Sequence, residues 1–228
     1  MLGNLVDTEI CIVSKTVLTM LGDDPTMENI KEEFIEQMNL SETACDRTQA
    51  YILEKPHYYA RVNDPRTYQA ITKDIITRKC APLVVDSPVF NTKMSVQPFN
   101  KYLGKGVTKQ ISVKISDGCV IGEGTKIGTL EGKSKTKIVK SVIGKECTIG
   151  DGVSIRNCVI WDNVTIGDNC TIENALVCEN VTIGSGVKIE TGTMIDKDVK
   201  VFADVAIPEN TVVSCLRLEN SKYKAVED

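Results

Sequence analysis

An aliphatic residue returns every six positions from about residue 115 to residue 213. The positions form four runs, with steps of five joining the last three: Ile115, Ile121 and Ile127; Ile143, Ile149 and Ile155; Ile160, Ile166 and Ile172; Val177, Ile183, Ile189, Ile195, Val201, Ile207 and Val213. Two steps of six and one of five give a period of seventeen residues. A unit of six residues is too short for a helix and too regular for a loop, so the pattern predicts a repeat architecture.

Two other positions of each unit are also restricted. The residue four places after the aliphatic is small or aliphatic, and it includes Cys119, Cys147 and Cys170. Glycine often follows the aliphatic directly, and Asn, Asp or Gly fills the remaining turn. A strand of a few residues followed by a turn fits this pattern. Three units then make one triangular coil, and stacked coils pair as parallel strands. We predict a hexapeptide β-helix of about five coils over residues 107–214, with a tail over 215–228.

One insertion interrupts the repeat. Ile127 and Ile138 occupy equivalent places, and residues 128–137 between them predict a loop at a corner of the prism. The loop carries Lys133, Lys135 and Lys137. Because runs of charge usually face solvent, a solvated insertion is favoured over a binding patch. The three lysines nevertheless stay candidates for contact with a partner.

The first 85 residues follow other rules. The pattern predicts, in order, a strand over 5–13, a helix from the cap Ser14 to Leu21, a helix over 27–38, strands over 50–54 and 58–62, and a helix with Asp64 as N-cap and Pro65 as its first residue, ending near Lys79. This segment therefore has an α+β or α/β character. Residues 86–106 contain several Pro and Gly residues and predict a connector.

Composition narrows the function classes. Of 228 residues, 42% are hydrophobic and 5% aromatic, which suits a globular core built from Val and Ile, and the mean hydropathy is −0.08. The net charge of −4 excludes a generally basic nucleic-acid binder. No run approaches 18 apolar residues, so no membrane span is expected. Nine cysteines without a Cys-x-x-Cys pair indicate reduced cytosolic thiols and neither disulfides nor a metal site.

The residue types that hexapeptide enzymes need are mostly missing. Acyltransferases on this fold need a histidine general base beside the coils, and the only histidine, His57, lies outside the repeats. A sugar pyrophosphorylase needs a Gly-rich phosphate loop, and none occurs in the sequence. We therefore predict no catalytic residue and no cofactor. Trp161 directly follows a core aliphatic, so it is predicted to point outward, either as an interface anchor or as a local packing residue.

Several segments, in order along the chain, resemble one family. They are the run Leu5–Leu18, the run Tyr59–Asn63 with the helix after it, the run Val159–Cys170 with its Ile-Trp-Asp step, and the run Leu176–Asn180. They are similar to the epsilon subunit of translation initiation factor 2B, which belongs to the nucleotidyltransferase-like, sugar-pyrophosphorylase superfamily. The resemblance implies a mixed fold: the C-terminal part of a nucleotidyltransferase-like α/β domain over residues 1–85, followed by a left-handed parallel β-helix of hexapeptide repeats.

The resemblance also implies a function. It predicts a cytosolic subunit of the guanine-nucleotide-exchange complex that acts on initiation factor 2, with a gamma-like subunit as the first partner and no nucleic acid or membrane partner. Two departures argue against catalysis by this chain. The helical exchange domain of the family has no counterpart before Asp228, and the family's Asn-Phe pair aligns with Pro25 and Thr26. We expect a chain truncated at both ends that serves assembly.

Alternatives stay open at this point. Asp23 and Asp24 are candidates for a contact loop by their place in the family, although an ordinary polar turn is favoured. A degenerate nucleotide-sugar pyrophosphorylase subunit, similar to mannose-1-phosphate guanylyltransferase, is the second function. A hexapeptide acyltransferase is the third, and the absence of histidine from the repeats argues against it.

Overall fold

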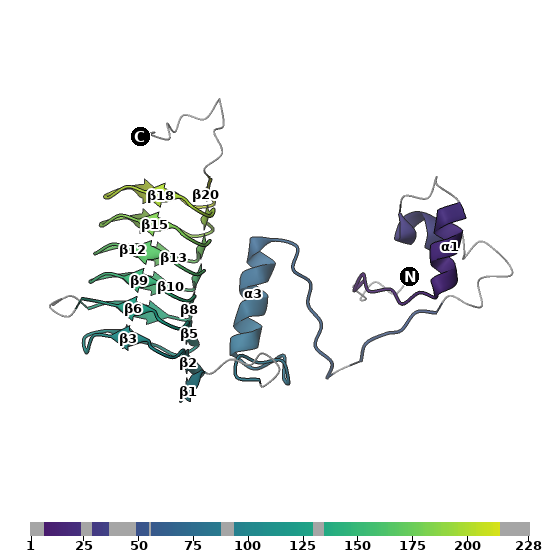
Figure 1. Ribbon diagram of the computed structural model, residues 1–228, viewed down its shortest axis with the longest axis horizontal. Coiled ribbons are helices and arrows are strands. Elements are labelled where there is room, and N and C mark those ends of the chain that lie inside the picture. Colours follow the sequence, from purple (N-terminus) through teal and green to yellow (C-terminus); the bar gives the residue numbers. More distant parts are fainter. Residues whose placement is uncertain are drawn as a thin grey trace, which may run out of the picture. The chain divides into compact units, whose positions relative to one another are not determined.

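The computed structural model describes residues 7–23, 29–36, 49–54, 56–87, 94–129 and 135–214. The chain divides into two compact units, residues 1–61 and residues 62–228. The second unit contains helix α3 (Pro65–Ile76) and a stack of short strands (Figure 1). Helix α3 thus shares a unit with the strands, whereas the sequence grouped it with residues 1–85. None of the described helices is long and apolar enough to cross a membrane.

The strands form three sheets that make the three faces of a prism. Sheet A contains β1 (Ser95–Gln97), β2 (Lys101–Leu103), β5 (Cys119–Ile121), β8 (Val142–Ile143), β11 (Val159–Ile160), β14 (Leu176–Val177), β17 (Met194–Ile195) and β20 (Val212–Val213). Sheet B contains β3 (Thr108–Lys109), β6 (Lys126–Ile127), β9 (Thr148–Ile149), β12 (Thr165–Ile166), β15 (Thr182–Ile183) and β18 (Lys200–Val201). Sheet C contains β4 (Lys114–Ile115), β7 (Lys137–Val139), β10 (Ser154–Arg156), β13 (Thr171–Glu173), β16 (Lys188–Ile189) and β19 (Ala206–Ile207).

The predicted parallel β-helix is confirmed. Ile143 pairs with Ile160 and Ile160 with Val177 in parallel strands, so the seventeen-residue spacing is one coil. The stack has about six coils where the sequence predicted about five. The first coil begins at β2, ahead of residue 107, and its strand β3 carries Lys109 where later coils carry Ile. Because Lys109 replaces the expected aliphatic residue, the six-residue pattern did not predict the first coil.

The interior is a ladder of aliphatic side chains. Nearly all of the largest fully buried side chains are Ile at the six-residue positions. Where the position four places later holds Thr or Cys, its buried side chain donates to a carbonyl at a corner. Thr125 Oγ1 donates to the Gly144 carbonyl at 2.8 Å, and Cys147 Sγ to the Trp161 carbonyl at 3.1 Å. Buried corner carbonyls need such partners, which explains why Thr or Cys recurs at this position.

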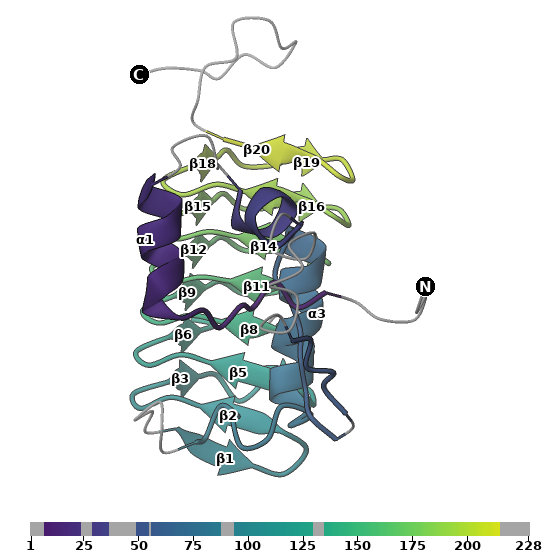
Figure 2. The same ribbon diagram turned by 90° about the vertical axis from the view of Figure 1, so that its right-hand side faces the viewer.

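The three faces of the prism differ in polarity. The outward residues of sheet A are apolar and include Val120, Val159 and Leu176, each less than 9% exposed. The equivalent outward residues of sheet B are Thr or Lys and are exposed. Helix α3 runs beside sheet A, as the two ribbon views agree (Figure 2). Its C-terminal residue Ile76 packs with Tyr102 and Val120, so α3 covers the one apolar face of the β-helix.

The insertion between β6 and β7 lies at the corner that joins sheets B and C. Ile127 pairs with Ile149 in sheet B and Ile138 with Ile155 in sheet C. Both side chains point inward, as predicted, but they lie on neighbouring faces and not at equivalent places in one sheet. Residues 130–134 of the loop lie outside the described residues.

The first unit contains helix α1 (Lys15–Asp23) and the π-helical turn η1 (Ile30–Phe34). Helix α1 follows Ser14, as predicted. The strands predicted over 5–13, 50–54 and 58–62 are not formed by those of their residues that the structure describes. These segments are instead tied by polar contacts, including ion pairs of Lys31 with Asp7 and of Arg61 with Glu9. A nucleotidyltransferase-like α/β arrangement is therefore not shown.

Candidate protein-interaction surface

Helix α3 is fixed at its N-terminus by a capping box. Asp64 Oδ1 accepts from the Thr67 backbone N–H at 2.7 Å, and Thr67 Oγ1 accepts from the Asp64 N–H at 3.1 Å. Pro65 follows the cap, as the sequence predicted. The backbone hydrogen bond to Asp64 holds the pKa of that carboxyl below its usual value. The cap therefore defines where α3 starts, one turn before Tyr68.

Trp161 and Tyr68 meet beside α3. Trp161 directly follows β11 at the corner between sheets A and B, and its side chain is 39% exposed, so it points outward as predicted. The centroids of the two rings are 6.4 Å apart, and the ring planes meet at an angle of 62°. This is an edge-to-face arrangement, which aromatic pairs prefer. Trp161 therefore packs locally on Tyr68, which is one of the two roles that the sequence left open, and its role as an interface anchor stays a prediction.

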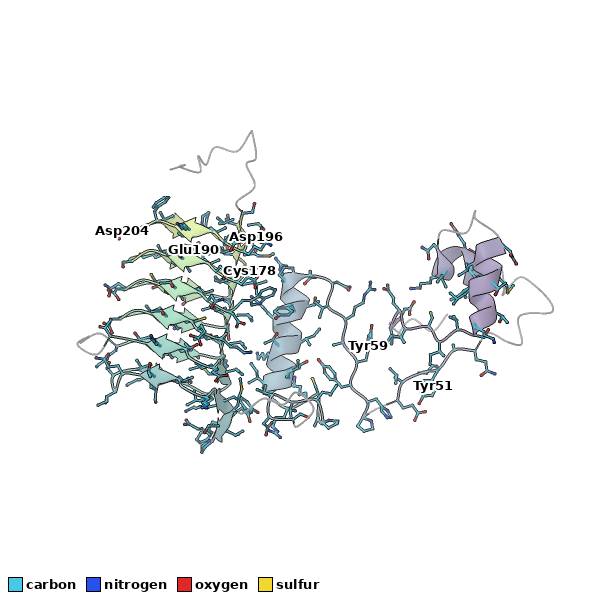
Figure 3. All side chains as sticks on the ribbon, in the orientation of Figure 1. Tyr51, Tyr59, Cys178, Glu190, Asp196 and Asp204 are labelled. Atoms are coloured by element: carbon cyan, nitrogen blue, oxygen red, sulfur yellow. The ribbon has the colours of Figure 1, made fainter. Side chains whose placement is uncertain are left out.

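Equivalent corner positions of successive coils stack above one another and form a column. The column that contains Trp161 requires glycine in the coil before it. Gly144 occupies the same corner one coil earlier, and a Cβ there would lie 2.6 Å from the Trp161 carbonyl carbon. Cys178 and Asp196 continue the column in the next two coils, on the side of the prism that faces α3 (Figure 3). The close approach of the coils at Gly144 fixes the backbone of Trp161.

A shallow groove of about 290 Å³ adjoins this pair of rings. Its floor contains Val142 and Val159, and its rim contains the carboxylates of Asp162 and Glu179. Asp162 Oδ1 also accepts from the Lys145 N–H at 2.6 Å, which orders the corner. An exposed Trp that rests on a half-buried Tyr, with polar groups at the rim, has the composition of a protein-binding anchor.

The other sequence candidates that the structure describes lie on other elements. Lys135 and Lys137 are exposed on and beside β7 in sheet C, and Lys133 lies outside the described residues. Asp23 is the exposed last residue of α1 in the first unit, and Asp24 lies outside the described residues. Of the described candidates, Lys135 and Lys137 therefore lie on a different face of the β-helix from Trp161.

The thiols on the β-helix are packing groups, as the sequence predicted for Cys119, Cys147 and Cys170. All three are at most 1% exposed. Burial raises the pKa of Cys147 and of Cys158 to about 11. Thiols with such pKa values are poor nucleophiles near neutral pH. Among the described residues no group of three His, Cys, Asp or Glu side chains converges to hold a metal ion.

His57 lies in the first unit, outside the coils. Its side chain is exposed, and Nδ1 lies 2.8 Å from the Glu54 carbonyl. A contact with a neighbouring carbonyl is typical of a turn residue, and His57 lies outside the repeats, as the sequence indicated.

Sequence reasoning missed a second groove, on the other side of α3. This groove has a volume of about 560 Å³. Arg66 and Lys73 line it from α3, and Lys140, Asn157 and Asn174 line it from the corner between sheets C and A. The spacing of Arg66, Gln69, Lys73 and Thr77 along one stripe of the predicted helix was a usable signal, but it needed the packing of α3 to acquire a meaning.

The fold and its repeats define the class of the second unit: a left-handed parallel β-helix of hexapeptide repeats. Within that class, the family model described as the EIF2B subunit epsilon LbH domain matches residues 99–207. The chain is therefore eIF2B epsilon-like over its β-helix, as the sequence resemblance predicted.

Relatives agree with this match. The chain is 34% identical over 126 residues to translation initiation factor eIF2B subunit epsilon of Dictyostelium discoideum, and 31% identical over 126 residues to that of Schizosaccharomyces pombe. Each alignment covers 55% of this chain. The alignments cover 17% and 18% of the two relatives, so the chain corresponds to less than a fifth of their length.

Solved structures are similar at lower identity. A hexapeptide transferase family protein from Anaplasma phagocytophilum is 18% identical, with 50% of this chain and 69% of that chain covered and a TM-score of 0.44. UDP-N-acetylglucosamine O-acyltransferase from Moraxella catarrhalis is 13% identical, with 52% of this chain and 66% of that chain covered and a TM-score of 0.32.

Proposed function

We propose that this chain is an assembly segment of an eIF2B epsilon-like subunit. In this role it contributes protein-binding surface to the multi-subunit exchange factor that acts on initiation factor 2, in the cytosol, and performs no catalysis by itself. The observation that carries the proposal is the match of residues 99–207 to the epsilon LbH domain. That match covers nearly all of the β-helix.

The build of the β-helix supports an assembly role. Its interior is packed with aliphatic side chains, and its apolar face is covered by α3. A rigid scaffold of this kind presents corner residues at fixed positions. The partner anchor that we assign is Trp161, supported by Tyr68 and flanked by Asp162. A gamma-like subunit is the first partner proposed.

The division of the chain into segments is a further proposal. We infer that residues 1–85 correspond to the C-terminal part of a nucleotidyltransferase-like α/β domain, that residues 86–106 connect it to the β-helix over 107–214, and that 215–228 form a tail. The support is the sequence resemblance of Leu5–Leu18 and Tyr59–Asn63 to the epsilon subunit. The exposed lysines Lys135 and Lys137, with Lys133 and the pair Asp23 and Asp24, remain secondary candidates for partner contact.

Co-expression tests the proposal. The 228-residue chain is produced together with the other factor 2B subunits, with an affinity tag on the gamma subunit, and purified through the tag. We expect the chain to be retained. A chain that elutes alone, in the presence of all those subunits, would contradict the proposal. Sugar-nucleotide binding detected by calorimetry under the same conditions would support the pyrophosphorylase alternative in its place.

A further inference from the structure

The groove on the basic side of α3 has the composition of a binding site. It lies within the second unit, and its volume of about 560 Å³ is in the range of ligand-binding pockets. Its floor is apolar, with Val142 and Val159 from sheet A. Its walls mix apolar and polar side chains and carry three cations, Arg66, Lys73 and Lys140.

These cations are largely uncompensated. No ion pair is recorded for Lys73 or Lys140 with any residue that the structure describes, and both side chains are exposed. Arg66 makes a 3.4 Å hydrogen bond to the amide oxygen of Asn210 and interacts with the carboxylate of Asp64, which does not line the groove. Asp117 is the one carboxylate that lines the groove, and it lies 3.7 Å from Lys101, outside the lining. The groove therefore has a net positive charge.

The two walls are elongated and of matching length. Arg66 and Lys73 are seven residues apart on α3, which places them about 10 Å apart along the helix axis. On the opposite wall Lys140, Asn157 and Asn174 occupy one corner position in successive coils, all with positive φ, and span about 10 Å at the spacing of paired strands. Cations spread over this distance do not converge on one phosphate-sized anion. They match a chain of anions laid along the groove.

We propose that this groove binds an extended, acidic protein segment of about three or four residues. The carboxylates on one edge of the segment meet Arg66 and Lys73, and those on the other edge meet Lys140. The side-chain amides of Asn157 and Asn174 lie beside the backbone of the segment, and its apolar atoms rest on Val142 and Val159. The other groove, beside Trp161, carries the carboxylates of Asp162 and Glu179 and repels the same ligand. This site is independent of the eIF2B assignment.

A charge-matched pair of variants tests the site. The probe is fluorescein-labelled octaglutamate, and its anisotropy is followed as the full chain is added at low ionic strength. The test variant is Lys73→Gln with Lys140→Asn, which keeps at residue 140 the Asn that the next two coils carry in the same conformation. The control is Lys126→Gln with Lys200→Gln, which removes two exposed lysines from sheet B. We expect the test variant to bind about three- to tenfold more weakly, and the control to change binding less than twofold.

A second variant tests the location without changing charge. Ala70 lines the groove and is exposed, so Ala70→Trp fills it from the helix side. We expect at least a threefold loss of octaglutamate binding with an unchanged circular dichroism spectrum. Equal losses in the test and control lysine variants would overturn the proposal, as would full binding by Ala70→Trp or no binding by the wild-type chain. Tighter binding of inorganic phosphate or of octauridylate than of octaglutamate would also overturn it.

Discussion

Two positions on the β-helix hold glycine for different reasons, one steric and one conformational. Substitutions at both test the stacking of the coils. At Gly144 a Cβ would lie 2.6 Å from the Trp161 carbonyl carbon and 2.7 Å from the Asp162 nitrogen. Both atoms belong to the backbone of the next coil, so no side-chain rotation relieves the overlap. At Gly118 the nearest atoms would be 3.9 Å from a Cβ, and the reason for glycine is a φ of +64°.

The structure sets the expected magnitudes. In Gly144→Ala the neighbouring coil must shift, which strains the core and weakens the hydrogen bond from the Gly144 N–H to the Ile160 carbonyl, now 2.8 Å. Overpacking and a weakened buried hydrogen bond together lower the free energy of unfolding by about 2–4 kcal/mol. Gly118→Asn adds a larger side chain, but Asn157, Asn174 and Asn210 already adopt this conformation at the same corner. It should therefore change the free energy of unfolding by less than about 0.5 kcal/mol.

Urea unfolding followed by circular dichroism measures both variants against the wild-type chain. We predict that Gly118→Asn, the larger substitution, is harmless and that Gly144→Ala is not. A general preference for small residues at turns would predict the reverse order. If Gly144→Ala unfolds at the same urea concentration as the wild-type chain, the result contradicts the close approach of the two coils described at Gly144. If Gly118→Asn is the more damaging variant, the assignment of the corner conformation is wrong.

Three further predictions use other parts of the structure. Ile155→Ala empties a fully buried position of the aliphatic ladder and should lower the free energy of unfolding by about 2–5 kcal/mol in urea titration, whereas Thr165→Ala on the exposed face of sheet B should change it by less than about 0.5 kcal/mol. Because the folded pKa of Asp64 is depressed below its unfolded value of 3.8, the cap stabilises α3 above that value and is lost as the pH falls through the lower folded value. The fluorescence of the single tryptophan, Trp161, should then shift to the red below about pH 3.8 as Tyr68 leaves it, and Asp64→Asn, which cannot titrate, should abolish the Asp64-linked part of the shift. Iodoacetamide at pH 8 should modify the exposed Cys11 in the folded chain and reach Cys147 and Cys158, whose pKa values burial raises to about 11, only after unfolding; peptide mass mapping that finds Cys158 modified as fast as Cys11 would refute the packing described.

The β-helix was predictable because each coil repeats one simple rule. The side chain at every sixth position must fill the interior. Ile recurs at these positions in coil after coil, so the pattern is easy to recognise. The cap of α3 was predictable for a similar reason, since Asp64-Pro65 is a local signal. Predictions that rest on local chemistry or on repetition therefore held.

The position of α3 was not predicted, although the sequence contains a signal for it. The residues just before the inward aliphatics are Val142, Val159 and Leu176 in sheet A but Thr148, Thr165 and Thr182 in sheet B. An apolar outer face needs a cover, and α3 supplies it. The strands predicted over 5–13, 50–54 and 58–62 are not formed in their described parts. The reason is that β-propensity expresses a fit to a neighbouring strand, and no described strand pairs with these residues.

The most direct test of the proposed function is the affinity of the chain for the gamma subunit of factor 2B, measured by surface plasmon resonance with two aromatic variants. Trp161→Ala removes the proposed anchor, and Phe202→Ala removes a ring that is 63% exposed at another corner of the β-helix. We predict that Trp161→Ala weakens binding at least about thirtyfold, as loss of a tryptophan hot spot does, and that Phe202→Ala changes it less than about threefold. Equal affinities of the wild-type chain and Trp161→Ala, or no binding by the wild-type chain, would contradict the account.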